Sequence, residues 1–434
     1  MAPIIILYAT GYSYNFKKNK IEKTGIIFIE SIPKDASVFI NNEYKKNTPA
    51  KFRRVLPDIY EVTISKEGYY PWKKTLKVES NLTTFANHIV LFKNNLPINI
   101  IEGNINIFTT APDETKLVYS VIKKTTEEIR MLNLRNGSDF LVEEINLNTY
   151  NDLAAVSWSA NGKLLINKII GDFNNYLVLD VSSLEVTDIF NITRTGFDKM
   201  KWGGDNNLYG LRKAVLHRID LLNKTDATIL SANITDFQVK NSDILFVEKT
   251  ANESVLNKID LGTNGGEPVK IKLPSPSDFE FYDSPSGFIS LIDKKNQDLF
   301  ILREKIFEDR DVASNIVFQD KAKEISWSDD LKKILFYNDF EISVFDLSSG
   351  QKNLITRYGN QINKAFWHNN NPYIIYQIDN SIKVIEESLD EQKNDATLVR
   401  LPEIKKIVID ENGKNIYFIG SAGAQAGIFK MEIQ

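Results

Sequence analysis

The sequence predicts an all-β chain: a small β-sandwich followed by a β-propeller of eight four-stranded units, with seven units as the second choice. A short phrase of alternating apolar and polar residues recurs about every 43 residues, and a period of this length built from short strands is typical of propellers. Each phrase follows an aromatic or apolar anchor and a turn rich in Gly, Asn and Asp. No sustained helical periodicity interrupts the repeats.

The recurring phrase marks the third strand of each unit. Its copies begin at Met131, Tyr176, Leu216, Leu256, Leu299, Ile342, Ile382 and Ile428.

The first strand of each unit is expected to end at an anchor residue. The anchors are Thr110, Trp158, Trp202, Val239, Tyr282, Trp327, Trp367 and Ile409. Four of them are tryptophans that recur at the repeat spacing. This regularity favours packing between neighbouring units over a row of sugar-stacking rings.

A fourth, outer strand follows seven of the eight phrases. The candidates are residues 140–143, 186–190, 227–230, 269–273, 305–307, 352–355 and 398–401. The chain ends just after the eighth phrase, which would leave an open sheet edge. We therefore expect residues 97–101 to supply the missing strand and the propeller to comprise residues 97–434.

Residues 24–93 form a separate unit in which strand-like runs alternate with turn signals. The runs are 25–30, 37–40, 50–55, 60–65, 72–78 and 88–92. Residues 38–40 and 60–64 alternate between apolar and polar side chains, as strands do when one face is buried.

This segment resembles the PEGA domain, a small β module of surface-associated proteins. The resemblance rests on residues 24–31, Pro33-Lys34-Asp35-Ala36, residues 38–41, Thr48-Pro49 and residues 64–69. The middle two residues of the tetrad depart from the family pattern, although its Pro and Ala are present. The resemblance implies a non-catalytic, often extracytoplasmic module.

The repeated part is similar to the propellers of TolB-type and WD40-like proteins. Trp158-Ser159 with Gly162-Lys163-Leu164-Leu165, and residues 346–350, carry this similarity. The Gly-His and Trp-Asp signatures of WD40 repeats are missing. The similarity implies a fold that enzymes, sensors and scaffolds share.

Residues 1–16 combine an apolar run with the aromatic residues Tyr8, Tyr12, Tyr14 and Phe16. The run is too short to span a bilayer, which takes about 20 residues. We expect it to be the end of a membrane-anchoring helix whose first half lies upstream of Met1, with the aromatic residues at the membrane interface. The alternative is a plain N-terminal strand.

The sequence offers little for catalysis. It has no cysteine and three widely separated histidines, which excludes thiolate chemistry and Cys-ligated zinc. The common nucleophile, zinc-protease and phosphate-loop motifs are missing. Acidic clusters such as Asp329-Asp330 occur in turns, where Asp is expected for local hydrogen bonds. We expect no catalytic residues, no metal and no cofactor.

Two loops between second and third strands are candidates for contact with a ligand. They carry Asp172 and Phe173 in one unit, and Asn338, Asp339 and Phe340 in another. Exposed aromatic rings flanked by Asn and Asp suit a sugar or a peptide. A third loop, 421–427, lies at an equivalent position.

The leading hypothesis is a non-catalytic, membrane-tethered protein on the extracytoplasmic face of the cell envelope. In it the PEGA-like unit is a spacer and the propeller binds a protein or an envelope glycan. Residues 1–96 hold 15 basic and 8 acidic residues, which favours an anionic neighbour. No nucleic-acid partner is expected. The alternatives are a hydrolase or lyase in the propeller channel, and a soluble TolB-like partner-binding protein.

Overall fold

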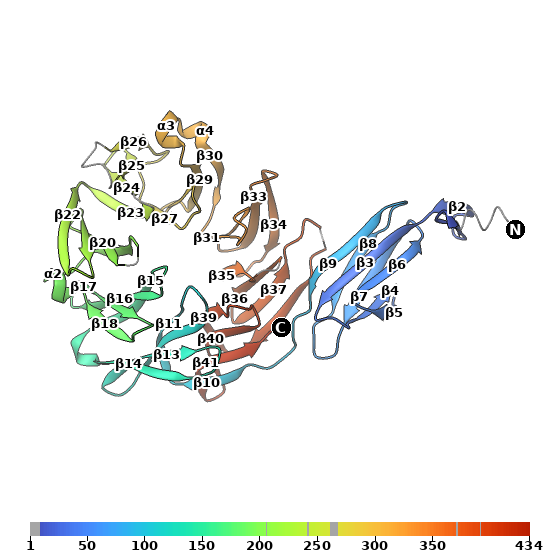
Figure 1. The fold of residues 1–434 in the computed structure, drawn as a ribbon, viewed down its shortest axis with the longest axis horizontal. Helices are drawn as coiled ribbons and strands as arrows, with labels where there is room; N and C mark the ends of the chain where they lie inside the picture. The colour runs from blue at the N-terminus through green and yellow to red at the C-terminus, as the bar shows by residue number, and fades with distance from the viewer. Residues whose placement is uncertain (1–8, 205, 241–242, 261–267, 370–371, 391) are drawn as a thin grey trace.

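The computed structural model describes residues 9–204, 206–240, 243–260, 268–369, 372–390 and 392–434. Almost all regular structure in these residues is β (Figure 1). The few helical turns are η1 (Leu147–Thr149), α2 (Phe190–Thr193), α3 (Ile306–Asp309) and α4 (Val312–Asn315). Among the described residues, no helix has the length and apolar character needed to cross a bilayer. The apolar run at the N-terminus falls almost wholly on residues 1–8, outside the described residues.

The N-terminal unit is a sandwich of two sheets, which confirms the predicted fold class of this part. One sheet has the order β6-β3-β9 and the other β5-β4-β7-β8. Their strands are β3 (Gly25–Ile32), β4 (Ser37–Ile40), β5 (Glu43–Asn47), β6 (Ala50–Val55), β7 (Ile59–Ser65), β8 (Trp72–Lys77) and β9 (Thr83–Val90). Of the run expected at 88–92, residues 88–90 are the end of a longer strand that begins at Thr83 and pairs in parallel with β3, and residues 91–92 lie beyond it.

Alternation along the strands builds the sandwich core. Ile27 and Ile29 of β3 face Val62 and Ile64 of β7 in one cluster of buried side chains. The turn before β4 explains two residues of the Pro-Lys-Asp-Ala tetrad. Asp35 has a φ of 60°, a left-handed conformation that Asp tolerates better than most residues. Ala36 is fully buried, and its amide donates to the Thr48 hydroxyl.

A short hairpin precedes the sandwich. It consists of β1 (Tyr12–Asn15) and β2 (Lys20–Lys23), which pair only with each other. Figure 1 places it at the end of the sandwich that is remote from the rest of the chain.

The remaining described residues form eight four-stranded sheets arranged as a ring (Figure 1). Sheet 1 contains β11 (Asn104–Thr110), β12 (Lys116–Ile122), β13 (Thr126–Asn133) and β14 (Asp139–Asn146). Sheet 2 contains β15 (Asp152–Trp158), β16 (Lys163–Ile170), β17 (Phe173–Asp180) and β18 (Glu185–Asp188). Sheet 3 contains β19 (Lys199–Trp202), β20 (Asn207–Arg212), β21 (Val215–Asp220) and β22 (Thr225–Ser231). Sheet 4 contains β23 (Ile234–Lys240), β24 (Asp243–Lys249), β25 (Ser254–Asp260) and β26 (Val269–Lys272).

The second half of the ring follows the same order. Sheet 5 contains β27 (Phe279–Tyr282), β28 (Phe288–Asp293), β29 (Asp298–Arg303) and β30 (Ile316–Lys321). Sheet 6 contains β31 (Glu324–Trp327), β32 (Lys333–Tyr337), β33 (Glu341–Asp346) and β34 (Gln351–Arg357). Sheet 7 contains β35 (Ile362–Trp367), β36 (Tyr373–Ile378), β37 (Ser381–Glu386) and β38 (Asp395–Arg400). Sheet 8 contains β39 (Glu403–Ile409), β40 (Asn415–Ala422), β41 (Gln425–Glu432) and, from the start of the ring, β10 (Ile98–Glu102).

The ring closes where β10 pairs with β41. Ile98 lies opposite Lys430, and Glu102 lies opposite Gly427. Gly427 has a φ of 149°, and a Cβ built there would lie 1.9 Å from the Ile101 carbonyl oxygen. Only glycine fits this close backbone contact, so the closing strand depends on it.

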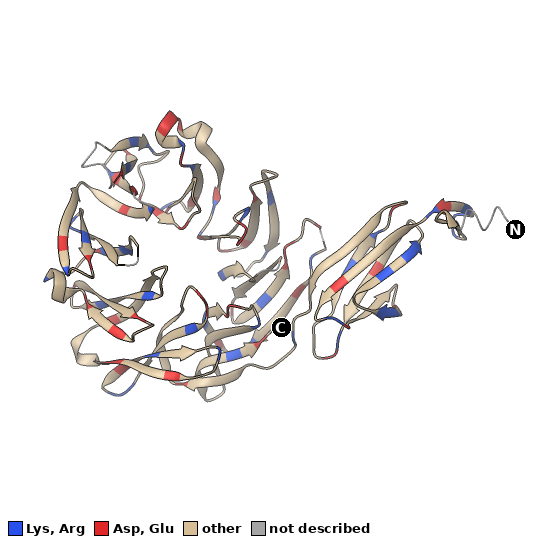
Figure 2. Cartoon of the chain, viewed as in Figure 1, with Lys and Arg blue, Asp and Glu red and all other residues tan. Residues whose placement is uncertain are grey.

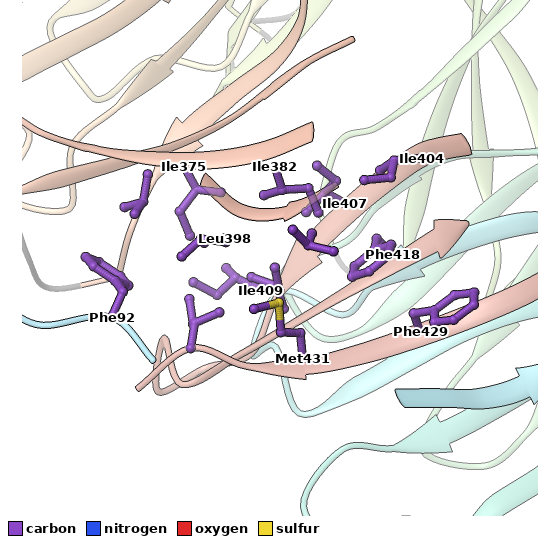
Figure 3. Packing of buried hydrophobic residues seen from close by; sticks show 14 of the residues in the cluster. Phe92, Ile375, Ile382, Leu398, Ile404, Ile407, Ile409, Phe418, Phe429 and Met431 are labelled. Atoms are coloured by element: carbon purple, nitrogen blue, oxygen red, sulfur yellow. The ribbon is translucent and has the colours of Figure 1, made fainter. Parts of the chain in front are cut away.

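Eight clusters of buried side chains each join two consecutive sheets. One of them joins sheet 8 to sheet 1 through Tyr417 and Tyr119. Figure 3 shows the cluster between sheets 7 and 8, where Ile382 and Leu398 meet Ile409 and Met431. Each sheet therefore buries both faces against its neighbours, which is the packing of a propeller.

One outer strand was wrongly predicted. Residues 305–307 do not form the fourth strand of sheet 5, because α3 occupies residues 306–309. Ile306 and Phe307 are buried in the cluster between sheets 4 and 5. The chain makes a second turn, α4, capped by the Asp311 carboxylate, before β30 completes the sheet.

The sandwich and the ring are joined by a short link with contacts on both sides. The Lys93 amide donates to the Ile433 carbonyl at 2.9 Å, and the Lys93 ammonium lies 2.6 Å from Glu432. Phe92 packs into the cluster between sheets 7 and 8 (Figure 3). On the sandwich side, the Tyr70 amide donates to the Phe92 carbonyl.

A second junction is built around one buried lysine. Lys74 of β8 is only 7% exposed, and its ammonium contacts Glu386 at 3.3 Å and Asp390 at 2.7 Å. It also donates to the Ser388 hydroxyl. The Asn394 side chain accepts from the Lys73 amide. These contacts fix the sandwich against the loop that follows β37.

Candidate functional site

The first strand of each sheet lines the middle of the ring (Figure 1). Seven of the eight predicted anchors are the last residue of such a strand, and Val239 is the last but one of β23. Three anchor tryptophans donate their indole N–H to the preceding sheet. Trp158 donates to the Thr109 hydroxyl at 2.9 Å, and Trp202 to the Ser157 carbonyl at 3.2 Å. Trp367 donates to the Ser326 carbonyl at 3.2 Å. The tryptophans thus link inner strands, in agreement with the packing role predicted for them.

The fourth tryptophan differs. The indole N–H of Trp327 is buried, and no described residue accepts a hydrogen bond from it. A cavity of about 440 Å³ lies beside it, at the boundary between sheets 5 and 6. In the described part of the chain, the boundary between sheets 5 and 6 therefore lacks the indole hydrogen bond that the other three tryptophans make.

A cavity of about 420 Å³ opens in the channel wall. Four consecutive inner strands line it: β15, β19, β23 and β27. Its lining combines the rings of Trp158, Trp202, Phe281 and Tyr282 with the polar side chains of Ser157, Lys199, Lys201, Gln238 and Glu280. We call this hollow the channel pocket.

Alternation along β19 supplies the lysines of the channel pocket. Met200 is buried in the cluster between sheets 2 and 3, and Trp202 packs against the same cluster. Lys199 and Lys201 project from the other face of this strand. The sequence Lys-Met-Lys-Trp carries this pattern, although its lysines were not among the predicted site residues.

Asp236 ties three inner strands together behind the channel pocket. It is 1% exposed, and its carboxylate lies 2.9 Å from Lys199 and 2.9 Å from Lys201, both on β19. It also accepts from the Phe281 amide of β27 at 2.8 Å. One buried carboxylate thereby joins sheets 3, 4 and 5.

Charge compensation sets the protonation of this group. Burial by itself would raise the pKa of Asp236, but the ammonium groups of Lys201 and Lys199 and the Phe281 amide outweigh it and lower the pKa. For Lys201, burial is the largest effect and lowers the pKa, with Lys199 adding to the shift. Asp236 is therefore a structural carboxylate whose ionised form is favoured by its surroundings.

Two buried polar atoms of the pocket wall have no partner among the described residues: Ser157 Oγ and Gln238 Oε1. Unpaired polar atoms of this kind are costly in a folded protein unless water or a ligand binds them. The pocket itself offers the indole and phenol rings as stacking surfaces beside the partly exposed side chains of Lys199, Lys201 and Glu280. This combination suits an amphipathic ligand such as a sugar ring or a peptide side chain.

The predicted ligand loops lie at hairpin tips and not in the channel pocket. Phe173 begins β17 and is 71% exposed, with Asp172 exposed beside it. Phe340 is 51% exposed in the turn between β32 and β33. Asn338 caps this turn by accepting from the Phe340 and Glu341 amides, and Asp339 contacts Lys323 and Gln361. Asn338 and Asp339 therefore have local structural partners.

The two loops do not converge. Phe173 belongs to sheet 2 and Phe340 to sheet 6, and these sheets lie on opposite sides of the ring (Figure 1). They are two separate exposed aromatic side chains, and a ligand that contacted both would have to extend across the propeller. Part of the third loop, Ala424–Gly427, lines a cavity of about 590 Å³. The other lining residues are mostly Gly and residues at the ends of strands.

Two of the three histidines, His217 and His368, have structural surroundings. His217 is buried and contacts the Asp226 carboxylate and Arg212. His368 is 1% exposed, its ring nitrogens face the Gly413 and Asn369 carbonyls, and burial lowers its pKa. Within the described ranges, no three His, Cys, Asp or Glu side chains come together as metal ligands would.

Among the described carboxyl groups, Glu114 has a raised pKa. Burial raises the pKa of Glu114, and the nearby charges of Asp410 and Asp329 add to the effect, against a hydrogen bond from Asn369. Asp410 has a structural role in a turn, because its carboxylate accepts hydrogen bonds from the Lys414 and Asn415 amides. Asp330, beside Asp329, likewise accepts from Ser328 and the Lys332 amide.

Comparisons with known proteins agree with this architecture. Residues 24–91 match the PEGA domain family, so the predicted resemblance is confirmed. No curated protein matches the chain in sequence. Among solved structures, the chain is similar to a eukaryotic initiation factor, with 11% identity and a TM-score of 0.52 over 79% of this chain and 88% of that one.

Two further solved structures are similar to the ring. The Dos1 propeller has 16% identity and a TM-score of 0.51, covering 79% of this chain and 96% of its own. Dipeptidyl peptidase 4 of Porphyromonas gingivalis has 10% identity and a TM-score of 0.54, covering 78% of this chain and 61% of its own. At these identities the similarity shows the propeller fold alone. The chain thus combines a PEGA domain with a β-propeller.

Proposed function

We propose that this protein is a non-catalytic binding protein of the cell envelope, held at the membrane on its extracytoplasmic face. The PEGA domain acts as a spacer, and the ring binds a protein segment or an envelope glycan in the channel pocket. The observation that carries the proposal is the composition of this pocket. Aromatic rings line it beside Lys199, Lys201 and Glu280, and the two lysines are held from behind by the buried carboxylate of Asp236.

The fixed junction supports the spacer role. Lys74 and the link at Lys93 attach the PEGA domain to sheets 7 and 8, so the ring is held at a defined distance and angle from the N-terminal end. A flexible tether would need none of these contacts.

The proposal is tested with a variant that fills the channel pocket. Val156 lines the pocket and is 44% exposed, so Val156→Trp should obstruct it without burying a new group. Leu222→Trp, at a turn of sheet 3 that is 71% exposed, is the matched control. Both variants and the unaltered chain are used to capture ligands from a solubilised envelope fraction and from a panel of cell-wall glycans.

We expect Val156→Trp to lose at least about tenfold in captured ligand and Leu222→Trp to lose none. Equal capture by all three proteins would remove the channel pocket as the site. No capture by the unaltered chain would contradict a binding role.

A hydrolase or lyase is the second candidate, because Glu114 is a half-buried carboxyl group held by the Asn369 amide, and its pKa is raised. A general acid needs a pKa near the working pH. If glycans are shortened during the capture experiment and Glu114→Gln stops this without reducing capture, the enzyme is the correct function. Glycans that are recovered intact support the binding protein.

A further inference from the structure

The end of the PEGA domain that is remote from the ring has a composition of its own. It comprises the hairpin at residues 12–23 and the neighbouring segments 53–59 and 77–82, and we call it the distal tip. Figure 1 shows the hairpin at one end of the long axis of the molecule, with the ring at the other.

Contacts hold the three segments of the distal tip together. The Thr24 amide donates to the Gly11 carbonyl, which closes the base of the hairpin. The Lys18 ammonium donates to the Pro57 carbonyl, and Lys17 lies 3.5 Å from Asp58. On the other side, the Ser80 hydroxyl donates to the Lys23 carbonyl. The tip is therefore one surface and not three independent loops.

Large apolar side chains are exposed on this surface. Phe16, at the hairpin turn, is 86% exposed and packs edge-on against Tyr14. Ile59, Leu82 and Ile21 are 63%, 55% and 53% exposed. Single exposed apolar residues are ordinary, but four on one small tip indicate a surface that is covered by something.

Basic side chains surround these apolar groups. The three segments contain seven basic residues, Lys17, Lys18, Lys20, Lys23, Arg53, Arg54 and Lys77, and three acidic ones, Glu22, Asp58 and Glu79. The acidic side chain of Glu22 is only 12% exposed beneath Lys18 and Lys20, whereas Lys17 is 84% exposed. Figure 2 shows that the ring, by contrast, carries both signs of charge interspersed.

We propose that the distal tip lies on the surface of an anionic lipid bilayer. Lysine ammonium groups would contact the headgroups while Phe16, Ile59 and Leu82 enter the boundary with the acyl chains. Flexible, exposed lysines beside aromatic and aliphatic side chains are the pattern of membrane-surface segments. Lysine is depleted in protein–protein interfaces, which favours lipid over a protein partner.

This inference rests on the proposed membrane location and adds the lipid class and the orientation. With the tip on the bilayer, the fixed junction directs the ring away from the membrane along the long axis of the molecule (Figure 1). The channel pocket would then be presented at a distance from the lipid surface.

The test is sedimentation of the full 434-residue chain with lipid vesicles. Vesicles of phosphatidylcholine alone are compared with vesicles in which about a third of the lipid is phosphatidylglycerol. Two tip variants are used. The first carries the three substitutions Lys17→Gln, Lys18→Gln and Lys20→Gln. The second carries Phe16→Ser and Leu82→Ser. Two matched control variants change residues on the far side of the ring. One carries Lys224→Gln, Lys270→Gln and Lys272→Gln, and the other carries Leu222→Ser. All proteins retain residues 1–8, so neutral vesicles report any contribution of that segment.

We expect preferential binding to the anionic vesicles, a loss of about tenfold or more in either tip variant, and no loss in the controls. Raised salt should weaken binding of the unaltered chain. Equal binding to both vesicle types, or tip variants that bind like the unaltered chain, would overturn the inference. Binding to native membranes but not to pure lipid would also overturn it and indicate a protein partner. None of these outcomes would contradict ligand binding in the channel pocket, which the Val156→Trp capture experiment tests separately.

Discussion

Lysines occur both in the channel wall and on the distal tip, but they are arranged in opposite ways. In the channel, Lys199 and Lys201 share the buried carboxylate of Asp236 and join neighbouring sheets. On the tip, Lys17 and Lys77 are 84% and 72% exposed, and their acidic neighbours are themselves at the surface. Compensated charge within the ring acts on stability, whereas exposed charge on the tip is available to an external partner.

The largest effect on stability is expected at Asp236. Asp236→Asn would leave two lysines facing a neutral group, and removal of one partner from a buried ion pair costs about 3 kcal/mol or more. Because the pKa of Asp236 is lowered on folding, its contribution is present above the unfolded value near 3.8 and is lost as the pH falls through the folded pKa. Denaturant unfolding should show a large stability difference between variant and unaltered chain at neutral pH and a smaller one at acidic pH. A difference that does not change with pH would contradict this charge pairing.

A smaller effect is expected at the junction. Lys74→Ala removes a buried ammonium from Glu386 and Asp390 and should destabilise the contact between sandwich and ring by about 2 kcal/mol. The control is Lys77→Ala, because Lys77 pairs with Glu79 on the surface. Limited proteolysis of the link at residues 93–97 should be faster in Lys74→Ala only. Equal rates in both variants would mean that the junction is held by other contacts.

Two of the anchor tryptophans form a matched pair for measuring the indole hydrogen bond. Trp202→Phe removes the bond to the Ser157 carbonyl, whereas Trp327→Phe removes an N–H group that has no described acceptor. The substitution is the same at both positions, so the difference between them isolates the hydrogen bond. We expect Trp202→Phe to be less stable than Trp327→Phe by about 1 kcal/mol in denaturant unfolding. The reverse order would show that Trp327 has a partner.

The smallest effect is expected on the tip. Replacement of Lys17, Lys18 and Lys20 by Gln should change the free energy of unfolding by less than about 0.5 kcal/mol, since surface pairs contribute little. The same variant should lose binding to anionic vesicles. A large loss of stability would show that these lysines stabilise the fold as the channel lysines do, and would contradict the difference between the two regions.

Much of the ring follows from the sequence, because each anchor stands at a turn that ends an inner strand. Strand counting also identifies residues 97–101 as the segment expected to complete the eighth sheet. The error at residues 305–307 has a physical cause: Ile306 and Phe307 are apolar enough for a strand, but they are buried from a helical turn. Hairpin tips such as Phe173 can be recognised locally.

The channel pocket could not be predicted, since it depends on side chains from four sheets. Asp236 lies 37 residues from Lys199 and 35 from Lys201, and nothing in its neighbourhood marks it as their partner. The alternation of Lys199, Met200, Lys201 and Trp202 is a local signal that lysines face the channel. It does not reveal whether their charge is compensated.

The proposed binding role is tested most directly by photo-crosslinking from defined positions. A photoreactive amino acid is placed at Val156 in the channel pocket, at Phe173 and Phe340 on the hairpin tips, or at Leu222 on the outside of the ring. Each protein is irradiated in a solubilised envelope fraction. We predict a specific adduct from Val156 and none from Leu222. Adducts from Phe173 or Phe340 without one from Val156, or no adduct from any position, would contradict a ligand site in the channel.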